Sequence, residues 1–340
     1  MAKGLRSFLL ASGLGLGLAV FGGSVALAGP SSGTGSDPQP QPTSYSRYVS
    51  MGDSVAAGAG LPVPLGVDED RICARSNFAY PSLVAAELGM SHSQLACSGA
   101  KLDDGIFEEQ RRKGVDIASQ LDRAFESGTP ELITMTVGAN DARWVQFLYQ
   151  CYLTRCDNSA TTAAMELFLT DMRLEMNWVL NRIEEKSAGD MPTVLVTGYY
   201  NPLSERDCVE TERVTDGEWT WINERATDLN GDIERVVDRH DFAHFVPIDF
   251  SDHGLCAEDS WVQGITESVP FHPTIDGQAA IAEAVVDTYY EVEADTDEPT
   301  RTPEPPSTET PAETDSTRNS GFSLRTIVDW LRRGDAEVRG

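Results

Sequence analysis

Four short stretches of the sequence carry the residue types that acyl transfer requires. They are Gly52–Val55 (GDSV), Cys97–Ala100 (CSGA), Gly138–Asp141 (GAND) and His272–Thr274 (HPT). Acyl transfer needs a nucleophile, a base within hydrogen-bonding distance of it, and donors directed at the oxyanion that develops during the reaction. Each stretch alone could be an ordinary turn or helix start, so the prediction depends on all four occurring in one chain.

Together the four stretches supply one residue for each chemical role. Ser54, at an expected strand-to-helix turn, would be the nucleophile, and His272 would take its proton during attack and return it to the leaving alcohol. The main-chain N–H groups of Ser54 and Gly99 and the side-chain amide of Asn140 would form the oxyanion hole. Asp53, inside the tight turn, is expected to accept hydrogen bonds from neighbouring amides and so to shape the loop.

The segments around these stretches alternate between short strand patterns and longer helical patterns. Strands are expected over Tyr48–Met51, Ser93–Ala96, Leu132–Val137, Thr193–Thr197 and His244–Ile248. Helices are expected over Tyr80–Leu88, Val115–Phe125, Ala163–Ile183, Ile222–Val237 and Ile275–Tyr289. This alternation predicts an α/β fold with a parallel sheet of about five strands covered on both faces, in which functional groups gather at the carboxyl ends of the strands.

The charge of the chain excludes several classes of partner. The 340 residues include 26 Lys and Arg against 54 Asp and Glu, which gives a formal net charge of -28. Such a chain is repelled by phosphate backbones and by anionic membrane surfaces, so we expect no nucleic-acid partner. No interior run of apolar residues is long enough to span a membrane, so we expect no stable membrane insertion.

The chain divides into a compact catalytic domain and low-complexity or targeting segments. The amino-terminal segment has a short positive region, a glycine-rich apolar stretch and an Ala26–Ala28 (ALA) cleavage site, which are typical of a secretory signal. We therefore expect a secreted, extracellular protein. The expected parts are a signal peptide (1–28), a flexible linker (29–44), the catalytic domain (45–290), an acidic Pro/Thr-rich disordered segment (291–320) and a short amphipathic tail helix (321–340).

Six cysteines follow the expected signal peptide, an even number that favours three disulfides in an exported chain. They are Cys73, Cys97, Cys151, Cys156, Cys208 and Cys256. The close spacing of Cys151 and Cys156 could also suggest a metal clip, but no histidine or second cysteine pair lies nearby to complete a zinc site. We therefore expect no metal site, and the residues alone leave the pairing of the cysteines open.

At its four motifs the chain resembles the SGNH (GDSL-type) hydrolase family, named for a Ser, Gly, Asn and His that match Ser54, Gly99, Asn140 and His272 in the same order. Further similarity to the secreted actinobacterial esterases and lipases of this family lies in Cys73–Ser76 (CARS), Tyr80–Pro81, Ala96–Ala100 (ACSGA) and His272–Thr274. The resemblance spans residues 48–290. It implies a flavodoxin-like three-layer α/β/α sandwich and ester hydrolysis without a metal or cofactor. It also implies disulfides between successive cysteines: Cys73–Cys97, Cys151–Cys156 and Cys208–Cys256.

One position departs from the family pattern, in which an aspartate three residues before the histidine accepts the imidazole Nδ1 proton. Val269 stands there in this chain. We expect the main-chain carbonyl of Val269 to accept that proton instead, as in some secreted relatives, so that the enzyme works with a Ser–His dyad. Glu267 and Asp276, the nearest acids in the sequence, are the alternative acceptors.

These observations predict a secreted serine esterase or lipase that hydrolyses carboxylic esters as a monomer. A carbohydrate (acetyl) esterase using the same residues, and a non-catalytic exported binding module, are the alternatives. Substrate choice is expected to depend on three loops, at about 61–71, 143–162 and 201–217, whose sequences do not identify the natural ester.

Overall fold

The computed structural model describes residues 46–62, 66–205, 208–209 and 211–297. The expected signal peptide, the linker and the tail helix lie outside these residues, as does most of the acidic segment. Among the described helices, none combines the length and apolar character needed to cross a bilayer.

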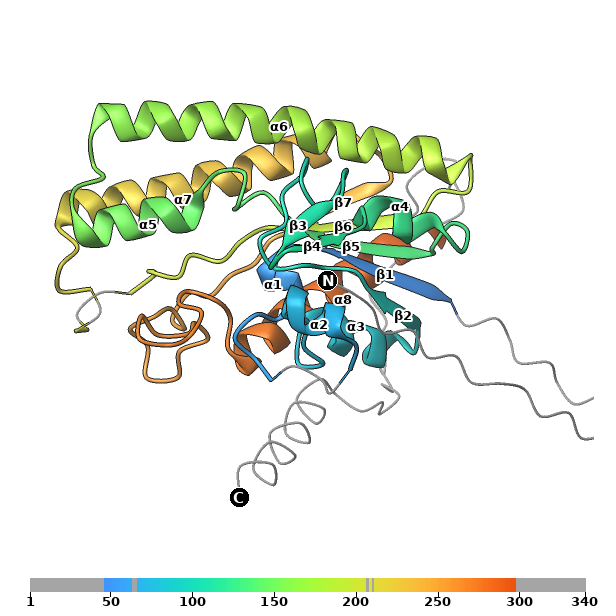
Figure 1. The fold of residues 1–340 in the computed structure, drawn as a ribbon, viewed down its shortest axis with the longest axis horizontal. Helices are drawn as coiled ribbons and strands as arrows, with labels where there is room; N and C mark the ends of the chain where they lie inside the picture. Colours follow the sequence, from blue (N-terminus) through green and yellow to red (C-terminus); the bar gives the residue numbers. More distant parts are fainter. Residues whose placement is uncertain (1–45, 63–65, 206–207, 210, 298–340) are drawn as a thin grey trace, which may run out of the picture. The chain divides into compact units, whose positions relative to one another are not determined.

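A parallel sheet of five strands forms the centre of the molecule (Figure 1). Its strands are β1 (Arg47–Gly52), β2 (Ser91–Gln94), β5 (Leu132–Thr136), β6 (Thr193–Thr197) and β7 (Ala243–Val246), in the order β2-β1-β5-β6-β7. All four neighbouring pairs are parallel. The chain adds β2 on one side of β1 and then adds β5, β6 and β7 on the other side, so the direction in which strands are added reverses at β1. The carboxyl ends of β1 and β5 therefore flank the crevice where ligands bind in open α/β sheets.

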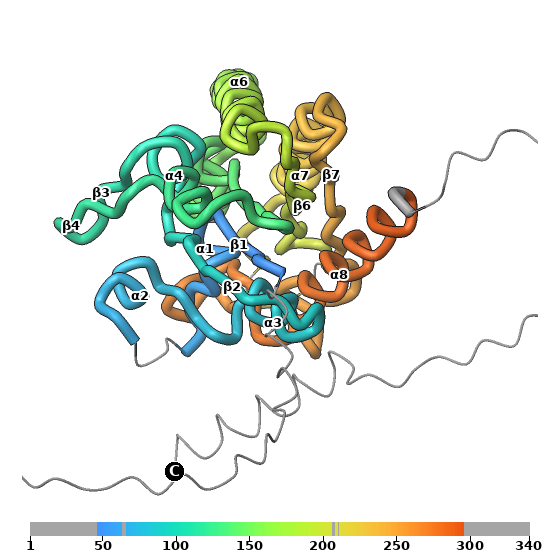
Figure 2. Tube along the Cα trace, turned by 90° about the vertical axis from the view of Figure 1, so that its right-hand side faces the viewer, coloured from blue at the N-terminus to red at the C-terminus, as the bar shows by residue number. Residues whose placement is uncertain are grey.

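Helices cover both faces of the sheet, so the expected three-layer α/β/α sandwich is confirmed (Figures 1 and 2). One face carries α1 (Ser54–Ala57), α2 (Asp68–Cys73), α3 (Tyr80–Leu88) and α8 (Ile275–Asp297); the other carries α4 (Gln120–Phe125), α5 (Trp144–Leu153), α6 (Ser159–Ser187) and α7 (Asp216–Val237). Every residue of β5 is buried, as expected for a parallel strand covered on both sides.

The helix expected over Val115–Phe125 is wrong in its first half. Val115–Ile117 forms β4, which pairs antiparallel with β3 (Gln110–Arg112) as a separate hairpin. The helical part, α4, begins only after Ser119, whose side chain accepts a hydrogen bond from the N–H of Asp122 and caps the helix. The apolar residues of this segment thus divide between a strand and a helix.

Two of the expected loops contain helices, and three helices, α6, α7 and α8, are longer than expected. The stretch 143–162 holds α5 and the start of α6, and 61–71 contains most of α2. Helix α8 continues past Tyr290 to Asp297, so the first residues of the segment expected to be disordered are helical.

Three disulfides join Cys73 to Cys97, Cys151 to Cys156 and Cys208 to Cys256, the pairs that the family resemblance implies. The first ties the end of α2 to the loop that follows β2 and carries Gly99. The second ties the last turn of α5 to the loop before α6. Two of the bonds thus fix segments that lie next to the candidate site.

Candidate active site

The turn after β1 has a geometry that only glycine permits at its first position. Gly52 has a φ of 136°, and a Cβ there would lie 2.3 Å from the carbonyl oxygen of Thr136 on β5. Asp53 then donates its N–H to the same carbonyl at 2.9 Å, and its Oδ1 accepts from the N–H of Val55 at 2.8 Å. The chain therefore turns sharply from β1 into α1 and begins the helix at Ser54.

Ser54 and His272, 218 positions apart, meet at this turn. The distance from Ser54 Oγ to His272 Nε2 is 2.7 Å, which is within hydrogen-bonding range. The histidine lies on the loop before α8, where its carbonyl accepts from the N–H of Gln263 at 2.7 Å and the N–H of Phe271 donates to the Gln263 carbonyl at 3.0 Å. This ladder holds the histidine against the nucleophile turn.

The other ring nitrogen of His272 hydrogen-bonds to the main-chain carbonyl of Pro270, the residue after the predicted acceptor. Nδ1 lies 2.9 Å from the carbonyl oxygen of Pro270, one residue after Val269. This carbonyl takes the role of acceptor, for which the carboxylates of Glu267 and Asp276 were the alternatives. Phe271, between the two partners, has a positive φ of 64°, and this turn directs the Pro270 carbonyl back at the ring. Burial lowers the pKa of His272. Hydrogen bonding to the carbonyls of Pro270 and Val269 opposes this change.

When the imidazole is neutral, this arrangement allows only one assignment of hydrogen-bond donor and acceptor to its two ring nitrogens. A carbonyl can only accept, so Nδ1 carries the hydrogen and Nε2 is left as the acceptor for the Ser54 hydroxyl. Burial favours the same neutral form by lowering the pKa of His272. The histidine is therefore held as a base that is ready to take the serine proton.

The predicted oxyanion donors converge on the same edge of the sheet. Asn140 follows β5, and its Nδ2 donates to the Ala100 carbonyl at 2.9 Å, which places its amide beside Gly99. The N–H of Cys97 donates to the Gly52 carbonyl at 2.9 Å and joins that loop to the nucleophile turn. Among the described residues, the main-chain N–H groups of Ser54 and Gly99 donate to no other group of the chain. Ser54, Asn140 and His272 line one pocket, and Gly99 is not among the lining residues of that pocket.

Two consecutive tyrosines, missed by sequence reasoning, connect the parts of the site. Tyr199 donates its hydroxyl hydrogen to Asp53 Oδ2 at 2.6 Å and accepts from the N–H of Ala139 at 3.2 Å, so it joins the nucleophile turn to the Asn140 loop. Tyr200 donates to the Phe271 carbonyl at 2.6 Å and so supports the histidine loop. Both lie shortly after β6, with only Gly198 between the strand and Tyr199, and that position at the carboxyl end of a strand is the signal that could have found them.

Burial changes the titration of the carboxyl group beneath the nucleophile. It raises the pKa of Asp53 to about 6, although hydrogen bonds from Tyr199 and Val55 oppose the shift. Because both oxygens of Asp53 already accept hydrogen bonds, its carboxylate acts on the loop and not on the substrate. The expectation that Asp53 shapes the turn therefore agrees with the geometry.

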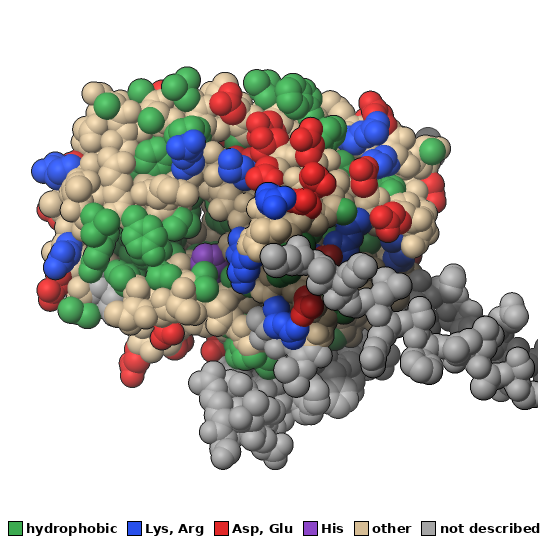
Figure 3. Space-filling model, viewed as in Figure 1, with side chains coloured by type: hydrophobic (Ala, Val, Ile, Leu, Met, Phe, Trp, Pro, Cys, Tyr) green, Lys and Arg blue, Asp and Glu red, His purple; other side chains and the backbone are tan. Residues whose placement is uncertain are grey.

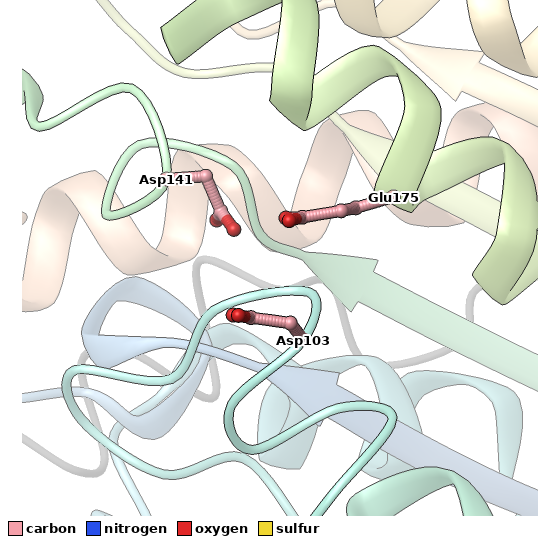
Figure 4. Close-up of side chains that lie close together, drawn as sticks. All are labelled: Asp103, Asp141 and Glu175. Atoms are coloured by element: carbon pink, nitrogen blue, oxygen red, sulfur yellow. The ribbon is translucent and has the colours of Figure 1, made fainter.

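Three carboxylates also lie close together, one of them on Asp141, the residue after Asn140 (Figure 4). Oxygen atoms of Asp103, Asp141 and Glu175 all lie within 4.8 Å of one another, and the Asp141 and Glu175 side chains point toward each other from the β5 loop and from α6. Burial raises the pKa of Asp141 to about 6. Burial and the charges of Asp103 and Asp141 raise that of Glu175 to about 7. Oxygen ligands of this kind suit Mg²⁺ or Ca²⁺, and without an ion the raised pKa values let the group retain protons instead.

The remaining wall of the pocket is apolar. Helix α5 contributes Trp144, Val145 and Leu148, and the loops after β6 and before α8 contribute Pro202 and Phe271. Figure 3 shows hydrophobic side chains gathered over the region of α5, next to a hollow in which a histidine is visible. A hydroxyl, an imidazole and amide donors thus face an apolar surface across one small cavity, an arrangement suited to attack on an acyl carbon that carries a nonpolar group.

The known proteins that this chain resembles include lipases and a phospholipase, and the family that it matches is one of lipases and acylhydrolases. The GDSL-like Lipase/Acylhydrolase family matches residues 50–280. Lipase 2 of Streptomyces coelicolor is 36% identical over 120 residues, but this match spans only 35% of the chain and 37% of that lipase. The crystal structure of phospholipase A1 from Streptomyces albidoflavus NA297 aligns with a TM-score of 0.58 at 25% identity, covering 73% of this chain and 99% of that one. An extracellular lipase from Streptomyces rimosus aligns with a TM-score of 0.59 at 24% identity, over 72% and 99% of the two chains.

Proposed function

Since the chain belongs to the GDSL-like lipase/acylhydrolase family, we propose that it is a carboxylic ester hydrolase that acts through an acyl-enzyme formed on Ser54. The observation that carries this proposal is the pair of hydrogen bonds around His272: 2.7 Å from Nε2 to Ser54 Oγ and 2.9 Å from Nδ1 to the Pro270 carbonyl. This geometry supports the proposed roles of Ser54 as nucleophile and His272 as its base.

The first half of the reaction transfers the acyl group to the enzyme. Ser54 Oγ attacks the ester carbonyl carbon while its proton passes to His272 Nε2, and the carbonyl oxygen becomes an oxyanion held by Ser54 N–H, Gly99 N–H and Asn140 Nδ2. The intermediate then collapses. The bond between the carbonyl carbon and the alcohol oxygen breaks, and the imidazolium returns the proton to the leaving alcohol.

The second half regenerates the serine. Water gives one proton to His272 and attacks the acyl-enzyme, and collapse of the second intermediate breaks the bond to Ser54 Oγ, which recovers the proton. Because Nδ1 faces a carbonyl instead of a carboxylate, the imidazolium is stabilised less than in a Ser-His-Asp triad. Transition-state stabilisation then depends more strongly on the three oxyanion donors.

We also propose that the enzyme works outside the cell. Three disulfides within the described residues support this location, because such bonds persist in oxidising compartments.

Labelling with an organophosphorus ester tests the mechanism and the non-catalytic alternative together. We expect stoichiometric modification of Ser54 in the wild type and cleavage of short-chain chromogenic esters, both lost in a folded Ser54→Ala variant. Circular dichroism and thermal unfolding of the variant provide the control for folding. A wild-type serine that does not react, or a variant that retains turnover, would contradict the proposal.

A further inference from the structure

The apolar wall of the pocket continues outward along one face of α5. Val145 lines the pocket, and Tyr149 and Leu153 follow at intervals of four residues, a spacing that places them on the same side of the helix. The side chains become more exposed with distance from the site: Tyr149 is 39% exposed and Leu153 is 69% exposed. We call Val145, Tyr149 and Leu153 the α5 stripe. At about 1.5 Å per residue it extends about 12 Å from the pocket.

A ring contact joins the stripe to Phe271, the residue that precedes His272. The ring of Tyr149 meets that of Phe271 edge to face with centroids 6.1 Å apart, and Phe271 directly precedes His272. The apolar surface therefore extends from Phe271 in the pocket lining to Tyr149 on the outer part of α5.

The composition of α5 favours a neutral, nonpolar ligand. Its ten residues, WVQFLYQCYL, include no Asp, Glu, Lys or Arg, although 24% of the chain is charged. A segment without charge beside the reacting atoms is suited to a hydrocarbon chain and not to a phosphate or a sugar acid.

The helix is also fixed before any ligand arrives. Trp144 and Phe147 are buried, and the Phe147 ring packs against Trp221 of α7 and Phe168 of α6 with centroids 5.8 and 6.3 Å apart. The Cys151–Cys156 disulfide anchors the last turn. A surface held in place in this way loses little conformational entropy when a ligand covers it.

We propose that the α5 stripe binds the acyl chain of the ester and sets a preference for medium and long chains over acetate. This inference rests on the proposed function, since it requires the acyl carbon to lie at Ser54. The polar side of the pocket is occupied by Asn140 and the donors of the oxyanion hole, so a nonpolar acyl chain leaves the site along the side formed by α5.

The test compares p-nitrophenyl acetate with p-nitrophenyl laurate, each kept below its aggregation concentration so that adsorption to micelles does not contribute. Leu153→Asp places a charge at the outer end of the stripe. We expect it to lower the laurate-to-acetate ratio of kcat/KM by about fivefold or more, because part of the chain loses an apolar contact. Leu167→Asp is the matched control, since Leu167 is 67% exposed but lies on α6, and we expect its ratio to equal that of the wild type.

The outcomes separate this inference from the proposed function. An unchanged ratio in Leu153→Asp, or an equal fall in Leu167→Asp, would overturn the acyl-chain assignment while leaving ester hydrolysis in place. Failure of the wild type to cleave either ester would overturn both. A fall restricted to Leu153→Asp, with Ser54→Ala inactive on both esters, supports both.

Discussion

At the scale of single residues, the site depends on a histidine that is kept neutral and correctly oriented without a carboxylate partner. The Pro270 carbonyl provides the orientation and burial provides the neutral form. A carboxylate at this position would raise the pKa of the histidine, whereas the arrangement found here keeps it low. The pH dependence of the enzyme is therefore set mainly by burial.

The pH profile of kcat/KM follows from this. Only neutral His272 can accept the Ser54 proton, and burial places its pKa below the ordinary value of 6.5. With a neutral ester, we expect activity to rise with pH and to reach half its plateau below 6.5. An acid limb centred at or above 6.5 would show that a negative charge controls the histidine, and Glu267→Gln or Asp276→Asn would then be expected to move it.

Asn140 provides the clearest test of the oxyanion hole. We expect Asn140→Ala to lower kcat by about 100- to 1,000-fold, because it removes one donor to the oxyanion. The substitution also removes the hydrogen bond to Ala100, at a cost of about 1 kcal/mol of unfolding free energy. Asn158→Ala is a matched control: it removes the cap of α6 at a similar cost in stability, and kcat should not change. Similar kcat values for the two variants would exclude Asn140 as a donor.

At the scale of elements, the strand ends could be predicted and several of the segments around them could not. Residues after β1, β2 and β5 were identified because carboxyl ends of parallel strands share one edge, and the alternation of patterns revealed that sheet. The residue before α5 does not predict the start of a helix, because Arg143 has a left-handed conformation and provides no side-chain cap. The choice of Pro270 over Val269 depends on a positive φ at Phe271, which nothing in the sequence indicates.

Tyr199 joins two elements, and its removal should affect both stability and catalysis. Tyr199→Phe leaves Asp53 Oδ2 and the Ala139 N–H without their partner inside the protein, which should cost about 1 to 3 kcal/mol of unfolding free energy. Because Ala139 precedes Asn140, we expect kcat to fall as well. Tyr149→Phe, which removes a hydroxyl from a residue that is 39% exposed, is the control and should leave the free energy of unfolding nearly unchanged. Denaturant titration and initial rates would measure both effects, and a variant as stable as the wild type would contradict this role.

The contact between α6 and the β5 loop should make stability depend on pH. The pKa of Glu175 is raised from 4.5 to about 7, so the folded state holds a proton that the unfolded state has lost between these values. Stability therefore falls as pH rises from about 4.5 to 7. In Glu175→Gln we expect the decline of Tm over this window to be smaller, with the remaining slope due to Asp141 and Asp53, whose pKa values are about 6. A decline equal to that of the wild type would show that Glu175 holds no such proton.

At the scale of the whole molecule, a formal charge of -28 opposes compaction, and the three disulfides act against this repulsion by restricting the unfolded chain. Their loops differ in length, with sequence separations of 5 for Cys151–Cys156, 24 for Cys73–Cys97 and 48 for Cys208–Cys256. Loop-closure entropy then assigns them different contributions, about 2, 3.5 and 4 kcal/mol in that order.

Replacing each pair by alanines should therefore lower the urea midpoint least for Cys151–Cys156 and most for Cys208–Cys256. Activity should follow a different order. The Cys73–Cys97 bond holds the loop that carries Gly99, so we expect its loss to lower kcat on acetate more than the loss of either other pair. Loss of Cys151–Cys156 loosens α5 and should reduce the laurate-to-acetate ratio instead. If kcat fell in proportion to stability across the three variants, the bonds would support the fold alone and neither the oxyanion hole nor the α5 stripe would depend on them individually.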